Sequence, residues 1–273
     1  MHALPTPDTP ENWDAASLGY AEKIAPALME AFADELVDCL DADAETEALE
    51  VGAGSGALTE ILARHVKSLL ATDFAPQMVN LLRDRMQAAG VANVTCQVMD
   101  GQALPLEGAM FDRAASSFAI MLFPDRAKGF SELRRILRPG GRAVVSGWAG
   151  PDKFELFGIL LEAMRTAFPD MPPPSAPPPV FSLADTSTFA AEMEAAGFDE
   201  VEVKLVSRDL SVASFDDLWA MVTTGAPPVK MLLEQAGAAG RTRLQDTLGR
   251  IVEQRFGHLQ ARRGRDLLAG VSG

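Results

Sequence analysis

The sequence has few of the residues on which many enzymes depend for catalysis. Its 273 residues include two cysteines, three histidines and a single tyrosine, Tyr20. Two cysteines, Cys39 and Cys96, build neither a disulfide framework nor a metal cluster, and no His, Cys or Asp residues fall at metal-ligand spacing. We therefore expect no metal site, and we expect both thiols in the core.

A long apolar run and an excess of positive charge are missing as well. The longest apolar run, residues 118–123, is far shorter than the ~18 residues that a membrane span requires. The first ten residues lack a basic stretch followed by an apolar one, so the expected location is cytoplasmic. With 24 basic and 38 acidic side chains the formal charge is −14, which disfavours nucleic acid and membranes as partners.

The order of the predicted elements divides the chain into three parts. Residues 1–44 are expected to form a short irregular start and two helices, with Pro26 in the first turn of the second helix. Residues 45–148 alternate short apolar strands with helices, which predicts a doubly wound, mostly parallel, Rossmann-like α/β sheet. Residues 149–273 are expected to add a helical cap and two more strands, which would bring the sheet to seven strands.

Local signals place the elements within this pattern. A helix is expected over residues 58–66, and the proline-rich stretch 172–179 is interpreted as a stiff connector. A helical stretch over 230–256 is expected to break near Gly240. The predicted strands cover residues 48–51, 68–72, 94–98, 111–117, 143–146, 201–210 and 266–271.

A glycine-rich turn follows the first predicted strand. The segment Glu50-Val51-Gly52-Ala53-Gly54-Ser55-Gly56 suits a sharp turn from a strand into a helix, because glycine tolerates positive φ and leaves the backbone open to a ligand. The free N–H groups at the start of the following helix attract a carboxylate or a phosphate. A glycine pattern alone does not specify the ligand, so its surroundings must decide.

Two carboxylates follow at the ends of the next two predicted strands. Asp73 lies 21 residues after Gly52, where an acid can accept the ribose hydroxyls of a nucleoside, although it could also cap the helix that opens at Pro76. Asp100 could accept the amine of adenine, although alone it would more often be a turn residue. Together with Glu50, these acids would line one crevice at the carboxyl ends of adjacent strands.

Taken together, these motifs resemble the class I S-adenosylmethionine-dependent methyltransferases that act on small molecules. The resemblance covers roughly residues 45–148. It rests on the glycine loop, on Ala71-Thr72-Asp73-Phe74 with Met78, on Asp100-Gly101-Gln102-Ala103-Leu104-Pro105, on Phe111-Asp112 and Ser117-Phe118, and on Leu133 with Arg138-Pro139-Gly140-Gly141.

The resemblance implies a role in cofactor binding for each matching position. The glycine loop would pass under the methionine part of S-adenosylmethionine, and Asp73 would hold the ribose hydroxyls. Phe74 would pack on the adenine, Asp100 would take its amine, and Ser117 and Phe118 would lie beside the sulfonium. The implied cofactor residues are Glu50, Gly52, Ala53, Gly54, Gly56, Asp73, Phe74, Met78, Asp100, Gly101, Gln102, Ser117 and Phe118.

The acceptor side of the site is less specified. Tyr20 could close over the cofactor as a lid or be an ordinary core tyrosine, and Met121 and Phe123 could line an apolar acceptor pocket or belong to the core. Methyl transfer from a sulfonium is an in-line displacement, which depends on positioning and needs a base only when the acceptor holds a proton. The expected partner is a small organic molecule, with a homodimer as a further option.

Two other functions stay open. Gly52, Gly54 and Ala57 also satisfy the G-x-G-x-x-G/A fingerprint, so an NAD(P)-dependent oxidoreductase on a Rossmann fold is one alternative. It is disfavoured because Tyr20 precedes the glycine motif and cannot form the Tyr-x-x-x-Lys pair of short-chain dehydrogenases. The other alternative is a non-catalytic, methyltransferase-like domain that binds the cofactor or a partner protein.

Overall fold

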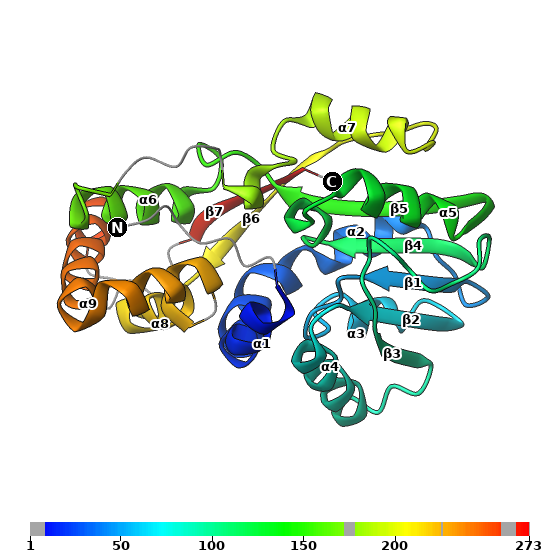
Figure 1. Cartoon of the computed structure of the whole chain (residues 1–273), viewed down its shortest axis with the longest axis horizontal. Coiled ribbons are helices and arrows are strands. Elements are labelled where there is room, and N and C mark those ends of the chain that lie inside the picture. Colours follow the sequence, from blue (N-terminus) through cyan, green and yellow to red (C-terminus); the bar gives the residue numbers. More distant parts are fainter. Residues whose placement is uncertain (1–8, 172–177, 225, 258–265, 273) are drawn as a thin grey trace.

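The strands form one sheet in the order β3-β2-β1-β4-β5-β7-β6 (Figure 1). The computed structural model describes residues 9–171, 178–224, 226–257 and 266–272. The strands are β1 (Glu47–Val51), β2 (Ser68–Asp73), β3 (Val94–Val98), β4 (Phe111–Ser117), β5 (Leu137–Trp148), β6 (Leu205–Ser211) and β7 (Asp266–Ser272).

Five neighbouring strands, from β3 to β5, pair in parallel. Strand β7 runs antiparallel to both β5 and β6. The predicted Rossmann-like α/β fold is therefore confirmed, and within the described residues the parallel block has five strands. Because parallel strands all end at the same edge, the loops after β1 to β4 meet at one place.

Helices cover both faces of the sheet and build a cap beyond it. In Figure 1, α6, α8 and α9 gather at the end of the molecule away from β1, β2 and β3. The helical elements are α1 (Pro10–Gly19), η1 (Tyr20–Met29), η2 (Glu30–Phe32), α2 (Ala33–Leu40), α3 (Thr59–Leu62), α4 (Pro76–Ala88), η3 (Ile120–Leu122), α5 (Arg126–Arg135), α6 (Glu155–Ala167), η4 (Pro179–Phe181), α7 (Thr186–Ala195), α8 (Phe215–Thr224) and α9 (Pro227–Phe256).

The amino-terminal segment corrects one prediction. Pro26 does not begin a second helix: α1, η1, η2 and α2 follow one another without a loop, and Pro26 lies inside the π-helix η1. Proline lacks an N–H and its ring clashes with the preceding turn of a regular α-helix, and the wider π turn changes the hydrogen-bond partners at this point. Residues 10–40 thus form one continuous helical arm.

Several element boundaries also differ from the predicted ones. The helix expected over 58–66 ends early, because Arg64 N and His65 N donate to the carbonyls of Ile61 and Leu62 in tight i→i−3 turns. The break in α9 lies at Gly237, which has φ 66°, and not at Gly240.

Strand β5 is longer than 143–146 and β6 begins only at Leu205. Of the proline-rich connector, residues 172–177 lie outside the described residues, and its end at Pro179 begins the short helix η4.

The helical arm is fixed to the sheet layer by polar contacts with α4. Arg85 of α4 donates to Glu30 of the arm at 2.8 Å and to Glu60 of α3 at 2.9 Å. Asp14 Oδ1 accepts a hydrogen bond from Gln77 N at 2.8 Å. The N-cap residue of α4 is Ala75, whose side chain cannot cap a helix, so Asp14 supplies the missing acceptor from α1.

This capping contact gives a testable stability difference. We expect Asp14→Ala to lower the free energy of unfolding by about 1 kcal/mol, the usual value of an N-cap acceptor. Asp14→Asn keeps an acceptor oxygen and should lose less. Urea denaturation of the three proteins measures the difference, and an Asp14→Ala variant as stable as the parent would contradict the capping role.

Candidate functional site

A cavity of about 380 Å³ lies where the loops after β1, β2, β3 and β4 meet. The helical arm contributes part of its wall. The described lining residues are Pro10, Trp13, Tyr20, Gly52, Gly54, Asp73, Phe74, Met78, Met99, Asp100, Gly101, Gln102, Ser117, Phe118, Ala119, Leu122, Phe123 and Pro124.

Most of the residues singled out in the sequence meet in this cavity, but four do not. Glu50 is buried beneath the loop, and Ala53 packs with the buried side chains of α4. A Cβ on Gly56 would lie 2.6 Å from Leu82 Cδ1, so this glycine serves the packing of the loop against α4. Met121 is buried in the main core and does not line the cavity.

The two remaining glycines of the loop, Gly52 and Gly54, differ in what an added side chain would contact. Gly52 and Gly54 have φ values of 72° and 56°, which favour glycine. A Cβ on Gly52 would lie 2.2 Å from Ala119 Cβ, so a larger residue would push the loop away from the end of β4. A Cβ on Gly54 would instead face Tyr20, at 3.6 Å from its ring. Gly54 therefore leaves its backbone open toward the cavity.

Asp73 connects two of the loops that shape the cavity. Its Oδ2 accepts from Gly54 N at 2.9 Å, and its Oδ1 accepts from Ala75 N at 3.0 Å. Burial raises the pKa of this carboxyl to about 6, although these hydrogen bonds act in the opposite direction. A carboxylate offers about four acceptor positions, so Asp73 can support the loops and still accept ligand hydroxyls.

Asp100 has a more exposed position after β3. Its Oδ1 accepts from Gln102 N at 2.9 Å and from Gln102 Nε2 at 3.1 Å. The Gln102 Oε1 atom in turn accepts from Asp125 N at 2.9 Å. Asp100 is therefore a turn residue that also lines the cavity, and its contact with the adenine amine stays a prediction.

Glu50 is a buried acid with an incomplete set of partners. Thr59 Oγ1 donates to its Oε2 at 2.6 Å, whereas its Oε1 has no hydrogen-bond partner among the described residues. Burial raises the pKa of Glu50 to about 8. Burial, together with the charges of Asp73 and Glu50, also raises the pKa of the Tyr20 hydroxyl.

The polar groups of the site fit a cationic ligand. The described lining residues include two carboxylates and the Tyr20 hydroxyl but no Lys, Arg or His. A cation near the unpaired Glu50 oxygen would offset the cost of a buried acid. A dinucleotide would place its phosphates beside these acids with no basic side chain from the described lining to balance them.

The wall after β4 is aromatic and strained. Phe118 has φ 54°, which is unusual for a residue other than glycine. Its ring packs against Trp148 and Phe32, with centroids 4.3 Å and 5.6 Å away, and its N–H donates to Ser146 Oγ at 3.2 Å. Such strain is often held in place at functional positions.

Trp13 is a lining residue that the sequence reasoning missed. Its ring meets the ring of Tyr20 edge to face, with centroids 5.9 Å apart. The two residues are seven positions apart in one helical arm, which places them on the same face. That spacing is a signal by which Trp13 could have been found.

Two further features, a metal site and a membrane-spanning helix, are not found among the described residues. No three or more His, Cys, Asp or Glu side chains converge in a way that could hold a metal ion. None of the helices in the described ranges combines the length and apolar character that crossing a membrane requires.

A parallel sheet with a glycine turn after β1 and acids after β2 and β3, all facing one cavity, defines a Rossmann-like nucleoside-binding domain. Residues 49–145 match the family model described as a methyltransferase domain. This part of the chain is a class I S-adenosylmethionine-dependent methyltransferase domain, and the cofactor of that class is S-adenosylmethionine.

Curated relatives agree with this assignment. The ubiquinone/menaquinone biosynthesis C-methyltransferase of Geobacter sulfurreducens is 31% identical over 119 residues, which cover 42% of this chain and 46% of that protein. The demethylmenaquinone methyltransferase of Thermus thermophilus is 33% identical over 114 residues, which cover 41% of this chain and 51% of that protein. The chain thus spans about half the length of these curated relatives.

A solved structure of a proposed methyltransferase from Bacillus halodurans C-125 superposes with a TM-score of 0.58. It covers 88% of this chain and 95% of that chain, with 18% identity. At this identity the likeness concerns the fold alone.

The buried Glu50 carboxyl gives a pH-dependent prediction. Its pKa in the folded protein, about 8, lies above the ordinary 4.5, so its contribution to stability is full below pH 4.5 and is lost as the pH rises through 8. Glu50→Gln removes this loss. The melting temperature of the variant minus that of the parent should therefore be larger at pH 9 than at pH 6.

Glu47→Gln in the same strand is the matched control. Hydrogen bonds from Arg138 and Lys67 lower the pKa of Glu47, so neutralising it should bring no gain at pH 9. Thermal melting of the three proteins at both pH values tests this. An equal melting difference for Glu50→Gln at pH 6 and pH 9 would refute the buried-acid assignment.

Proposed function

We propose that this protein transfers a methyl group in line from S-adenosylmethionine to a small, largely apolar organic acceptor. The main observation behind this proposal is that the glycine loop, Asp73 and Asp100 face one cavity. The described lining of this cavity contains acids and no basic side chain. A sulfonium donor is cationic and carries a nucleoside, so this set of groups matches both of its parts.

Each group of the cavity has a place in this proposal. The backbone at Gly52 and Gly54 would lie under the methionine part of the donor, with the Glu50 acid beneath it. Asp73 would accept the ribose hydroxyls, and Asp100 would accept the adenine amine. The buried side chain of Met78 would provide an apolar wall of the nucleoside site.

The protein's contribution to the reaction would be positioning and exclusion of water. The bound donor supplies an already activated methyl group. Tyr20 and Trp13 of the helical arm would cover the donor, and Phe118 would fix its reacting end through its packing on Trp148. Holding two reactants in line can contribute ~7–11 kcal/mol to lowering the barrier in favourable cases.

The ionisable side chains of the cavity favour a methyl acceptor whose reaction needs no strong base. The ionisable side chains of the described lining are Tyr20, Asp73 and Asp100. The raised pKa of Tyr20 keeps its hydroxyl protonated, and the two acids would be engaged with the nucleoside. The name of the Geobacter sulfurreducens relative, a C-methyltransferase, supports carbon as the methylated atom.

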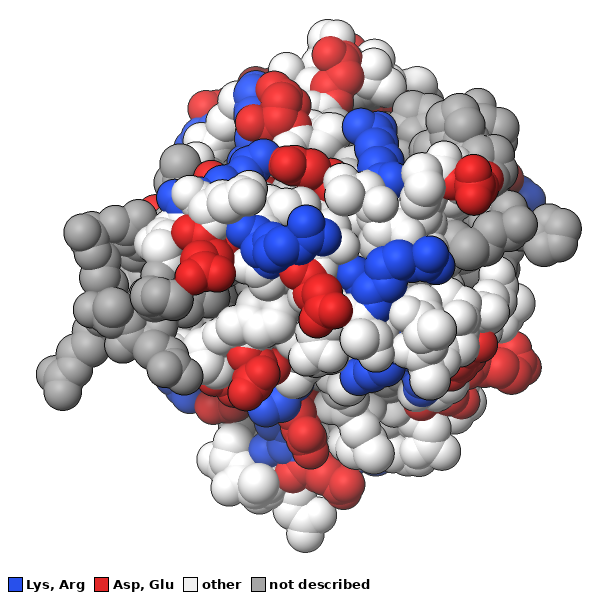
Figure 2. All heavy atoms as spheres, turned by 90° about the vertical axis from the view of Figure 1, so that its left-hand side faces the viewer, with Lys and Arg blue, Asp and Glu red and all other residues white. Residues whose placement is uncertain are grey.

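The charge distribution supports a small molecule over a nucleic acid. Figure 2 shows the face that the helical cap presents, on which basic and acidic side chains are interspersed. Such a face, in a chain with net charge −14, offers little attraction to a phosphate backbone.

Titration calorimetry with S-adenosylhomocysteine and with NAD tests the proposed donor. We expect saturable binding of S-adenosylhomocysteine and none of NAD. Binding of NAD alone would favour the oxidoreductase. A methyl-labelled donor incubated with cell extract, followed by mass spectrometry of the labelled product, then separates an active enzyme from a domain that only binds the cofactor.

Asp73→Asn tests the ribose assignment. We expect it to weaken S-adenosylhomocysteine binding by about tenfold or more, because the amide lacks the charge and one acceptor oxygen. Asp84→Asn, an exposed acid of the neighbouring helix α4, is the matched control and should bind as the parent does. Calorimetry measures all three proteins, and equal affinities would reject the assignment.

A further inference from the structure

The ring of Phe123 fills a narrow slot between two buried glycines at the cavity of about 380 Å³, the donor cavity. A Cβ on Gly101 would lie 2.8 Å and 2.9 Å from the ring atoms Cζ and Cε2. A Cβ on Gly129 would lie 2.7 Å from Cδ2 and 3.0 Å from Cε2. These distances are too short for real side chains, so both positions admit the ring because they lack one.

The glycine on the far side of the ring, Gly129, lies in the interior of α5. Glycine forms helices less readily than alanine, so its presence there lowers the stability of the helix. The atoms nearest to an added Cβ belong to the Phe123 ring and, at 3.7 Å, to Ile120. The close approach of the ring therefore accounts for glycine at this position.

A hydrogen-bonded bridge holds the chain next to Phe123. Gln102 Oε1 accepts from Asp125 N at 2.9 Å, and Gln102 Nε2 donates to Asp100 Oδ1 at 3.1 Å. Asp125 is the N-cap residue of α5 and follows Phe123 by two positions. The ring packing on Gly101 and the Gln102 bridge thus fasten Phe123 to the turn that carries Asp100.

This turn lies at the end of the cavity that is proposed to hold the adenine. Gly101 directly follows Asp100, the proposed acceptor of the adenine amine. The proposed reacting end of the donor lies at the end of β4, where Gly52 packs closely against Ala119. The slot therefore belongs to the nucleoside end of the cavity.

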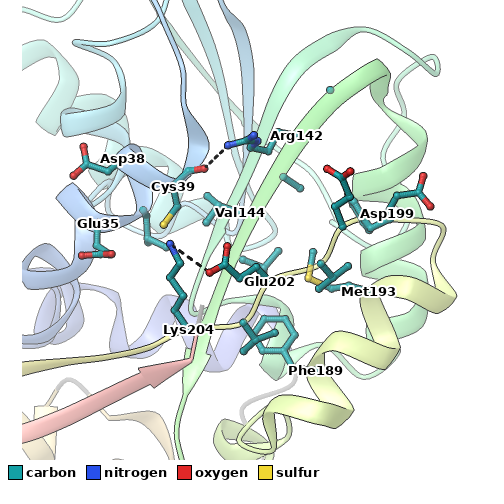
Figure 3. Close-up of a pocket in the computed structure, with 18 of the residues that line it drawn as sticks. Glu35, Asp38, Cys39, Arg142, Val144, Phe189, Met193, Asp199, Glu202 and Lys204 are labelled. Atoms are coloured by element: carbon teal, nitrogen blue, oxygen red, sulfur yellow. Dashed lines mark hydrogen bonds and ion pairs between the residues drawn. The ribbon is translucent and has the colours of Figure 1, made fainter.

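A larger cavity, of about 830 Å³, lies elsewhere in the fold (Figure 3). Its described lining comes mainly from α2, β5, α7 and residues 198–206 and does not include Phe123 or either glycine of the slot. Phe123 and Gly101 line the donor cavity instead. A ligand that meets the half-buried Phe123 ring is therefore one bound in the donor cavity.

We propose that Phe123 is a wall of the nucleoside site on which the adenine packs, and that Gly129 is a positioning residue that sets this wall from outside the cavity. The proposal rests on S-adenosylmethionine being the donor. A flat base gains from contact with an aromatic face, and a ring already held in its slot loses little freedom when the base arrives. Phe123 thus selects the donor and does not line the acceptor pocket.

Phe123→Leu keeps an apolar side chain and removes the aromatic face. We expect it to weaken S-adenosylhomocysteine binding about three- to tenfold, the range of an aromatic pair beyond its apolar area. Calorimetry should give the same factor for 5′-methylthioadenosine, which has the nucleoside but lacks the amino-acid part. Phe130→Leu changes a fully buried neighbour in α5 outside the cavity lining and should leave the affinity at the parent's value.

Gly129→Ala tests the positioning role without changing a lining residue. The added methyl group displaces the Phe123 ring, so S-adenosylhomocysteine should again bind about three- to tenfold more weakly. In the Phe123→Leu background the same substitution should weaken binding less than about twofold, because residues in contact have non-additive effects. Gly158→Ala in α6 is the matched control, since its Cβ would meet Pro151 O at an ordinary 3.4 Å.

The outcomes separate this proposal from the proposed donor. A parent protein that does not bind S-adenosylhomocysteine would overturn both. If the parent binds, an unchanged affinity of Phe123→Leu, or a loss for S-adenosylhomocysteine without one for 5′-methylthioadenosine, would overturn the nucleoside wall alone. Additive effects of Gly129→Ala and Phe123→Leu would overturn the positioning role. Melting curves show whether each variant is folded, and Phe123→Leu decides the matter if Gly129→Ala is not.

Discussion

The Asp73 carboxylate, which bridges the backbones of Gly54 and Ala75, is the interaction on which the shape of the candidate site depends. It joins the glycine turn after β1 to the turn after β2, and these two turns form the floor of the cavity. Its burial is costly, which its raised pKa reflects. This free-energy cost falls at a place where a ligand with hydroxyl groups and positive charge would offset it through hydrogen bonds and electrostatic attraction.

The helical arm supplies one wall of this cavity. Its contacts with α4, through Asp14 at one end and Glu30 nearer the other, hold Tyr20 above Gly54. The same residues therefore link the stability of the amino-terminal helices to the geometry of the site.

The sequence predicted the parallel part of the fold and the position of the cavity well, because apolar strands and glycine turns are local signals. It did not predict the π-helix around Pro26, since this depends on how the arm packs across the sheet. It also did not distinguish glycines that face a ligand from Gly56, which is required by a contact with Leu82 far along the chain. Trp13 was missed although its spacing of seven residues from Tyr20 places both rings on one face of the arm.

The most direct measurement of the central claim is a crystal structure of the protein with S-adenosylhomocysteine. We expect both ribose hydroxyls within hydrogen-bond distance of Asp73, and the adenine beside Asp100 with the glycine loop under the amino-acid part. A ligand bound with its ribose away from Asp73, or bound outside this cavity, would contradict the proposed donor site.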